Sequence, residues 1–278
     1  MEIELGKLVD EQIEKIKTTK KLDDGVYVDG DGSVEIITLN KENIVAERKE
    51  VSKFIRRDGD VLYKIRTRTG KELKATGCHP VMTFVNGEVN SVLISDLKEG
   101  SLIATPRKIE INGTKQDEEF ARLLGYIIGD GYIAKDRIEF VNADKEIIGD
   151  FVYLTRDKLG LDIRQRNEKN IKRIYFRDKK TVKELRNLFY KDYKEPITSE
   201  VKKIPQKFMM ADDVAISNLL AGLYDTDGSV RKDIAVIEYC TKNPNLAKQV
   251  QGLLLRFGII SKVKKRICNA VSGEKRVP

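Results

Sequence analysis

The chain has 278 residues, enough for two compact domains. It carries 52 Lys plus Arg against 44 Asp plus Glu, a formal charge of +8, with one histidine and three cysteines. So few cysteines, with no close pair, argue against a disulfide scaffold and against a zinc site. No run approaches the roughly 18 apolar residues that cross a membrane. We therefore expect a soluble chain in the reducing cytoplasm, with no membrane partner.

The first hundred residues consist of short runs with alternating polarity. Such runs lie at 34–39, 61–66 and 71–76, and Asp-Gly and Thr-Gly pairs separate them. Alternation bounded by turn residues predicts strands joined by hairpins. This part of the chain is therefore predicted to be an all-β module.

Further along, one nine-residue pattern occurs twice, as Leu-Leu-Gly-Tyr-Ile-Ile-Gly-Asp-Gly at 123–131 and as Leu-Ala-Gly-Leu-Tyr-Asp-Thr-Asp-Gly at 220–228. The apolar residues in and before each copy recur three and four positions apart, which predicts two amphipathic helices. Small residues stand four apart in each copy and so share one helical face. Such faces allow two helix backbones to approach closely. The small residues are Gly125 and Gly129 in one copy and Gly222 and Thr226 in the other.

Each copy ends in an acid followed by glycine, Asp130-Gly131 and Asp227-Gly228. Glycine suits the left-handed position that ends a helix, so each carboxylate is expected at a helix C-terminus. An anion is disfavoured there by about 0.3–1 kcal/mol. Two such ends side by side would repel unless divalent cations lay between them, and Mg²⁺ held by carboxylates, water and phosphate oxygens fits that need. Two-metal phosphodiester hydrolysis is the chemistry that this arrangement suggests.

The similarity between the two copies extends past the acids. A predicted strand, a helix and a glycine stop follow each acid at nearly equal spacing, ending at Gly160 and Gly258. A single copy is equally well read as a buried helix that ends in Asp-Gly. The second copy, with matching flanks, favours a structural repeat.

These paired motifs resemble the dodecapeptide signature of the LAGLIDADG homing endonucleases. The resemblance implies an α+β fold in which two αββαββα halves, related by a pseudo-two-fold axis, form a saddle over double-stranded DNA. It also implies a monomer with an internal pseudo-dimer, and Mg²⁺ or Mn²⁺ held by Asp130 and Asp227. Residues 202–205, Lys-Lys-Ile-Pro, resemble the Lys-x-Ile-Pro block of intein endonucleases. That match implies that Lys202 assists hydrolysis; a solvated linker lysine is the alternative.

The segment 161–183 is rich in basic residues and reads as a β-hairpin with one charged face. Such a ribbon can enter the major groove of DNA. A solvated, lysine-rich sheet edge is the plainer interpretation. A comparable strand is expected to begin at Lys262. The residues expected to contact DNA are Arg164, Arg166, Lys172, Arg173 and Arg177 of the hairpin, with Lys264 and Lys265 of the later strand.

The stretch Thr-Gly-Cys-His-Pro at 76–80 resembles the Thr-x-x-His block of the Hedgehog/intein (Hint) splicing fold. That resemblance implies that Thr76 and His79 assist the first acyl shift, His79 as proton donor to the leaving amide. A structural turn histidine is the alternative. Inteins also need an N-terminal Cys or Ser and a C-terminal His-Asn pair, and this chain begins at Met1 and ends at Pro278. We therefore expect that it does not splice alone and that its second endonuclease half is incomplete.

The predicted organisation is a partial Hint-like module at 1–110, a first endonuclease half at 117–195 and an incomplete second half at 200–278. The leading hypothesis is an intein-associated, site-specific DNA endonuclease. One alternative is a splicing fragment whose partners are host-protein segments and complementary intein pieces. The other is a DNA-binding protein without cleavage, against which the two acids at helix ends argue.

Overall fold

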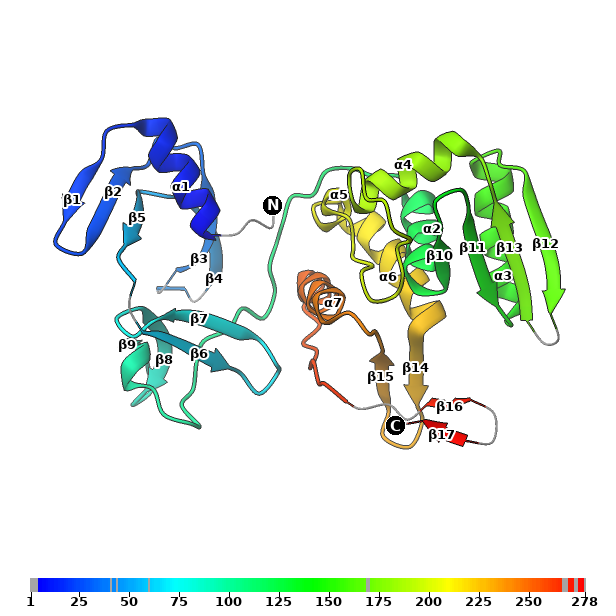
Figure 1. Ribbon diagram of the computed structural model, residues 1–278. Helices are drawn as coiled ribbons and strands as arrows, with labels where there is room; N and C mark the ends of the chain where they lie inside the picture. Colours follow the sequence, from blue (N-terminus) through cyan, green and yellow to red (C-terminus); the bar gives the residue numbers. More distant parts are fainter. Residues whose placement is uncertain are drawn as a thin grey trace. The chain divides into compact units, whose positions relative to one another are not determined.

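The computed structural model describes residues 5–277 except positions 41, 44, 60, 169, 170, 267–269, 273 and 274. The chain forms two compact units (Figure 1). One holds Glu110–Arg256, and the other holds Ile3–Ile109 and Phe257–Pro278. Within the described residues, no helix combines the length and apolar character needed to cross a bilayer.

The unit that contains the N-terminal segment is rich in strands, as the alternating runs predict, and also has one helix, α1 (Leu5–Ile16). Ile13 of α1 packs with Val28 and Phe54 in a small apolar core. Strands β1, β2 and β5 form one sheet, and the others form three separate hairpins, β3-β4, β6-β7 and β8-β9. The strands are β1 (Lys20–Leu22), β2 (Gly25–Asp29), β3 (Glu35–Asn40), β4 (Val45–Glu50), β5 (Lys53–Arg57), β6 (Leu62–Arg66), β7 (Glu72–Thr76), β8 (Pro80–Val85) and β9 (Glu88–Leu93).

The other unit begins with a four-stranded antiparallel sheet in the order β10-β11-β13-β12. Its strands are β10 (Gly131–Ile133), β11 (Ile138–Asn142), β12 (Ile163–Glu168) and β13 (Ile171–Phe176). Helices α2 (Glu118–Gly129) and α3 (Lys145–Val152) cover one face, where the ring of Phe140 stacks on Phe151 at 4.2 Å. A π-helical turn (Tyr153–Lys158) extends α3, and α4 (Lys179–Phe189) follows the hairpin. The basic hairpin is thus confirmed as β12 and β13.

The second copy of the repeat gives helix α6 (Asp213–Asp227), the paired strands β14 (Gly228–Arg231) and β15 (Val236–Tyr239), and α7 (Pro244–Arg256). A short helix, α5 (Gln206–Met209), precedes α6. The strand expected from Lys262 does not form, and residues 259–266 have no regular structure. The backbone N–H of Val263 donates instead to the carbonyl of Thr69. A short hairpin, β16 (Ala270–Ser272) and β17 (Lys275–Val277), comes after it.

Helices α2 and α6 pack through the stripe of small residues, as the sequence predicts. A Cβ added to Gly222 would lie 2.5 Å from the carbonyl oxygen of Arg122 and 3.1 Å from the Cα of Gly125. A Cβ on Gly129 would overlap the side chain of Thr226. Only residues this small allow the two backbones to touch. As a result, the C-terminal ends of both helices and their acids are brought together.

The glycines after the acids do not adopt the expected left-handed conformation. Gly228 is extended, with φ −88° and ψ 156°, and Gly131 is the first residue of β10. In both places the chain turns directly from helix to strand and passes against its own last helical turn. A Cβ would overlap the carbonyl of Ile127 in the first copy and of Tyr224 in the second. Lack of space, and not a positive φ, therefore requires glycine here.

We expect Gly222→Ala to lower the free energy of unfolding by about 2–3 kcal/mol, because the added methyl group meets backbone that has no room to move. Urea denaturation followed by circular dichroism measures this. Gly252→Ala is the matched control, since Gly252 lies in α7 with no neighbouring atom within 4 Å of its Cβ position. That change should raise the stability by up to about 1 kcal/mol. Equal effects of the two substitutions would contradict the close packing of α2 and α6.

Candidate functional site

Two carboxylates stand at the adjoining ends of α2 and α6. Asp130 is the C-terminal cap of α2, and Asp227 is the last residue of α6. Both helices begin with an aspartate cap, Asp117 and Asp212, whose side chains accept N–H groups of the first turn. The caps place negative charge where the helix dipole favours it, whereas Asp130 and Asp227 lie at the unfavourable end. The repeat therefore fixes both acids where something else must offset their charge.

Lys202 supplies positive charge at this position. Its ammonium donates to the carbonyl of Gly129 at 2.9 Å and also to the carbonyl of Gly131, so it binds the backbone on both sides of Asp130. The side chain is only 2% exposed. Its two backbone contacts pair carbonyls at the end of α2 that the helix itself leaves unpaired. The alternative of a solvated linker lysine is thus wrong for Lys202.

Burial and mutual charge shift the pKa values of all three groups. Burial, followed by the charge of Asp130, raises the pKa of Asp227 to about 6, and Lys202 opposes the shift. Burial also raises the pKa of Asp130, opposed by Asn142 and Lys202. The pKa of Lys202 falls to about 8 because burial outweighs the attraction of the two carboxylates. The three groups therefore act as one electrostatic unit that is short of positive charge.

The linker that carries Lys202 is fixed by helix α7 and the loop before it. The side chain of Asn243 donates to the Lys202 carbonyl at 2.7 Å. Gln249 binds both backbone polar groups of Ile204, at 2.8 and 3.0 Å. Lys203 points the other way, with its ammonium 3.9 Å from the ring centroid of Tyr190. These contacts orient the linker so that Lys202, and not the neighbouring Lys203, reaches the site.

The two carboxylates differ in their immediate surroundings. Asn142, at the end of β11, donates to Asp130 at 2.7 Å. The strand registers pair Gly131 with Phe140 and Gly228 with Tyr239, so Thr241 is the counterpart of Asn142. Both residues accept the N–H two residues further on, Asn142 from Asp144 and Thr241 from Asn243. The counterpart of the Asn142 amide in the second copy is thus a threonine hydroxyl.

The sheet face opposite α2 and α3 carries several of the expected basic residues. Arg164 pairs with Tyr175 across β12 and β13, and Arg166 pairs with Arg173. Because strand side chains alternate, these residues share one face, while Ile174 points to the helices. Arg164 and Arg166 are exposed. The hairpin thus presents a basic face, as the sequence indicates.

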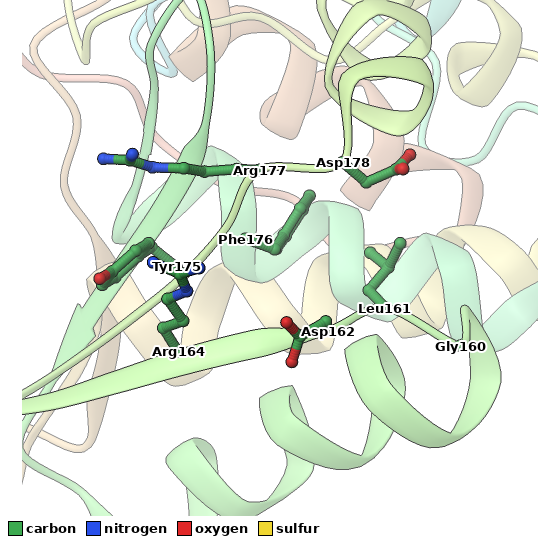
Figure 2. A pocket seen from close by; sticks show the side chains of 8 residues that line it. All are labelled: Gly160, Leu161, Asp162, Arg164, Tyr175, Phe176, Arg177 and Asp178. Atoms are coloured by element: carbon green, nitrogen blue, oxygen red, sulfur yellow. The ribbon is translucent and has the colours of Figure 1, made fainter.

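A pocket of about 290 Å³ lies at one end of this hairpin (Figure 2). The guanidinium of Arg177 lies 5.7 Å from the ring centroid of Tyr175, and Arg164 lies beside that ring in Figure 2. The residues that line the pocket are Gly160, Leu161, Asp162, Arg164, Tyr175, Phe176, Arg177 and Asp178.

Arg173 and Lys172 are placed differently from the hairpin's other cations. Arg173 donates to Glu139 at 2.6 Å and to both oxygens of Glu168 at 3.2 and 3.3 Å, so carboxylates occupy its guanidinium. Lys172 pairs with Asn142 on β11, two positions from Ile174, and therefore points to the helix side of the sheet. It does not share the face of Arg173. The sequence reasoning had assigned both side chains to one face.

The remaining site candidates belong to the other unit. Lys264 and Lys265 are exposed in the irregular segment before residue 267. Thr76 and His79 lie in a tight turn between β7 and β8, where the N–H of His79 donates to the Thr76 carbonyl at 3.1 Å. The hydroxyl of Thr76 lies 3.3 Å from the sulfur of Cys78, and the carbonyl of His79 accepts the N–H of Ile94 at 3.0 Å. The Thr-x-x-His segment is thus a backbone-bonded turn.

Sequence reasoning missed Asn142, Asn243 and Gln249. Asn142 had a usable signal, since it ends a predicted strand soon after the first acid, on the same side as Phe140. The other two had none, because their partners lie 41 and 45 residues away in the chain. Among the described residues, no three His, Cys, Asp or Glu side chains group as metal ligands.

Two family models match the chain. The model described as intein splicing domain matches residues 7–193, which is more than half of the chain. The model described as LAGLIDADG-like domain matches residues 215–277, beginning inside α6.

The chain is also similar to parts of much longer proteins. It is 35% identical over 214 residues to the replication factor C small subunit of Methanocaldococcus jannaschii, covering 75% of this chain and 11% of that protein. The same subunit of Thermococcus kodakarensis is 32% identical over 74% of this chain and 23% of its own length. The replicative DNA helicase DnaB of a Synechocystis species is 29% identical over 83% of this chain and 28% of its own length. The chain thus spans less than a third of each of these relatives.

Two solved structures show partial similarity. The PabCDC21-1 intein is 28% identical, with a TM-score of 0.34, over 37% of this chain and 62% of that one. Variants of the homing endonuclease I-DmoI are 20% identical, with a TM-score of 0.40, over 51% of this chain and 77% of theirs. Both TM-scores are low, so the assignment rests on the family models. The chain belongs to the inteins and carries an inserted homing endonuclease of the LAGLIDADG type.

Proposed function

We propose that this chain hydrolyses phosphodiester bonds of double-stranded DNA at specific sites, using divalent metal ions held by Asp130 and Asp227. The observation that carries the proposal is the pair of adjoining carboxylates at the ends of α2 and α6. Asp130 raises the pKa of Asp227, which indicates that the two charges are close. A protein that only binds DNA has no use for two acids in an unfavourable electrostatic position.

The residues at this site fit a hard divalent cation such as Mg²⁺ or Mn²⁺. Two carboxylates face a single buried ammonium, so one negative charge is left without a counterpart. A site with few protein ligands suits an ion that keeps water and phosphate oxygens in its coordination sphere. When bound, the ion supplies an activated water and stabilises negative charge on the phosphate oxygens.

Lys202 has two tasks in this proposal. It holds the backbone on both sides of Asp130 and so fixes the direction of that carboxylate. Its ammonium also places a positive charge beside the phosphate that is to be attacked, in a buried position where charge interacts strongly. Asn142 supports the same carboxylate by donating to it. The exposed face of β12 and β13, with Arg164 and Arg166, is proposed to contact phosphates and base edges.

Protein splicing is a second candidate function, favoured by the splicing-domain match at 7–193. In that role the imidazole of His79 would donate a proton to the leaving amide nitrogen, and Thr76 would help to hold the scissile bond. Host-protein segments and complementary intein pieces would be the partners. Mixing the chain with an N-terminal piece carrying the nucleophile and a C-terminal piece carrying His-Asn should then give a ligated product. We expect His79→Ala to slow its formation by about 100-fold or more; no product from the parent mixture would count against splicing.

Cleavage of a randomised duplex library in Mg²⁺ tests the endonuclease. We expect discrete cut sites, and a loss of at least about 100- to 1,000-fold in rate for Asp130→Asn and for Asp227→Asn, because each removes charge needed at the reacting phosphate. Asp157→Asn is the matched control, since Asp157 is exposed in the π-helical turn Tyr153–Lys158. Equal DNA affinity with and without Mg²⁺, and no product in either case, would favour a DNA-binding protein that does not cleave.

The raised pKa of Asp227 makes a separate prediction for stability without metal. The folded-state pKa of about 6 exceeds the ordinary 3.8, so the ionised carboxylate destabilises the fold fully above pH 6, and that cost declines as the pH falls from 6 to 3.8 and is lost below 3.8. Asp227→Asn should therefore be more stable than the parent by about 1 kcal/mol at pH 8 in EDTA, allowing for partial exposure of the group.

Thermal unfolding at pH 8, pH 5 and pH 3.5 checks this expectation. The advantage of Asp227→Asn should fall to about half at pH 5 and approach zero only near pH 3.5, where the carboxyl is mostly protonated in both the folded and the unfolded chain. Added Mg²⁺ should stabilise the parent more than the variant, because an ion that binds only the folded state raises its stability. A variant that is less stable than the parent at pH 8 in EDTA would show that charge repulsion does not govern this site.

A further inference from the structure

Glu139 occupies the middle of the sheet face that is proposed to contact DNA. On β11 it pairs with Tyr132 of β10 on one side and with Tyr175 of β13 on the other. Its neighbours Ile138 and Phe140 point to the helices, so the carboxylate points to the opposite, open face. It is nevertheless only 8% exposed. Side chains on that face must therefore cover it.

Two arginines provide the cover. Arg137 donates through Nε to one oxygen of Glu139, and Arg173 donates through Nη1 to the other at 2.6 Å. The Nε and Nη2 groups of Arg173 are bound by Glu168 at 3.2 and 3.3 Å. Hydrogen bonds from the two arginines hold the pKa of Glu139 below its usual value despite its burial. These four residues, Arg137, Glu139, Glu168 and Arg173, are called the arginine clamp below.

The arginine clamp has no net charge, although it lies on a face flanked by exposed cations. Arg173 donates on both edges of its planar guanidinium to carboxylates, so it cannot bind a phosphate without giving up contacts that it already has. Arg137 is held in the same way, by Glu139 and by Asp136 at 3.1 Å. A buried carboxylate that neutralises arginines works against general attraction to the DNA backbone, since that attraction depends on free cations.

We propose that Glu139 and Glu168 withhold Arg137 and Arg173 from phosphate contact and so limit binding to DNA of arbitrary sequence. This inference rests on the proposed DNA endonuclease function. The exposed Arg164 then carries the general attraction, whereas Arg166 lies 3.7 Å from Glu168 and is also partly neutralised. The part of the affinity that does not depend on sequence is kept low, so contacts to base edges make up a larger share of binding. A clamp that served only to stabilise the sheet would leave the salt dependence of DNA binding unchanged.

The test measures binding to a mixed-sequence duplex in EDTA, by fluorescence anisotropy across a range of KCl concentrations. Glu139→Gln/Glu168→Gln should bind about ten-fold more tightly than the parent at 100 mM salt. The slope of log affinity against log salt concentration should be steeper by about one to three, since Arg137, Arg166 and Arg173 each lose a carboxylate partner. The matched control is Glu146→Gln/Glu184→Gln, which removes two exposed carboxylates from helices α3 and α4. The control should change the affinity by two-fold at most.

Arg173→Ala tests whether Arg173 contacts phosphate in the parent or only when Glu139 and Glu168 are neutralised. In the parent it should leave the salt slope unchanged, because the arginine is already neutralised, whereas in Glu139→Gln/Glu168→Gln it should reduce the slope by about one. The parent comparison needs no glutamate variant, so the test stands even if the double variant does not fold. A lower slope for Arg173→Ala in the parent would overturn the clamp but leave the endonuclease in place. No binding of any duplex by the parent at low salt would refute the proposed function and this inference together.

Discussion

Helices α2 and α6 touch backbone to backbone, and the position of every group at the candidate site depends on that contact. The carbonyl of Arg122 faces the Cα hydrogens of Gly222, where no side chain fits. Because the small residues stand at the same distance from the end of each helix, the two helices end together. Asp130 and Asp227 are therefore neighbours by geometry, and their charges interact whether or not an ion is bound. The apolar cores on both sides hold this arrangement against the repulsion of the acids.

Side-chain hydrogen bonds fix the position of α2 along the axis of α6. Arg122 of α2 donates to Asp150 of α3 and to Asp225 of α6, the latter at 3.0 Å, and Tyr126 donates to Asp150 at 2.7 Å. A shift of α2 along α6 by one turn would move these side chains apart. Such a shift would break the bond to Asp225 and leave partly buried charge unpaired, which is costly. The alignment of Asp130 with Asp227 thus depends on these hydrogen bonds as well as on the close packing of the small residues.

The features that could be predicted from the sequence are those that local periodicity determines. The helices, the stripe of small residues, the acids at their ends and the basic hairpin all follow from spacing within about 15 residues. Features that depend on partners distant in the chain could not be predicted. Nothing near Arg173 indicates that Glu139 occupies its guanidinium, and the glycine after each acid suggested a left-handed cap, whereas Gly228 is extended. Lys202 was identified because residues 202–205 resemble the Lys-x-Ile-Pro block of intein endonucleases. Its burial depends on contacts with α7 and with the loop before that helix.

The contacts that bury Lys202 also make the two repeats depend on each other. Asn243 and Gln249, in the second repeat, bind the backbone of residues 202 and 204. This contact directs the Lys202 ammonium onto the end of α2, in the first repeat. The second repeat therefore shapes the surroundings of Asp130 before it contributes Asp227. A buried ammonium with a pKa of about 8 is costly to keep charged, and it stays at this position because carbonyls and two carboxylates surround it. The site is consequently assembled only when both repeats and the linker between them are folded together.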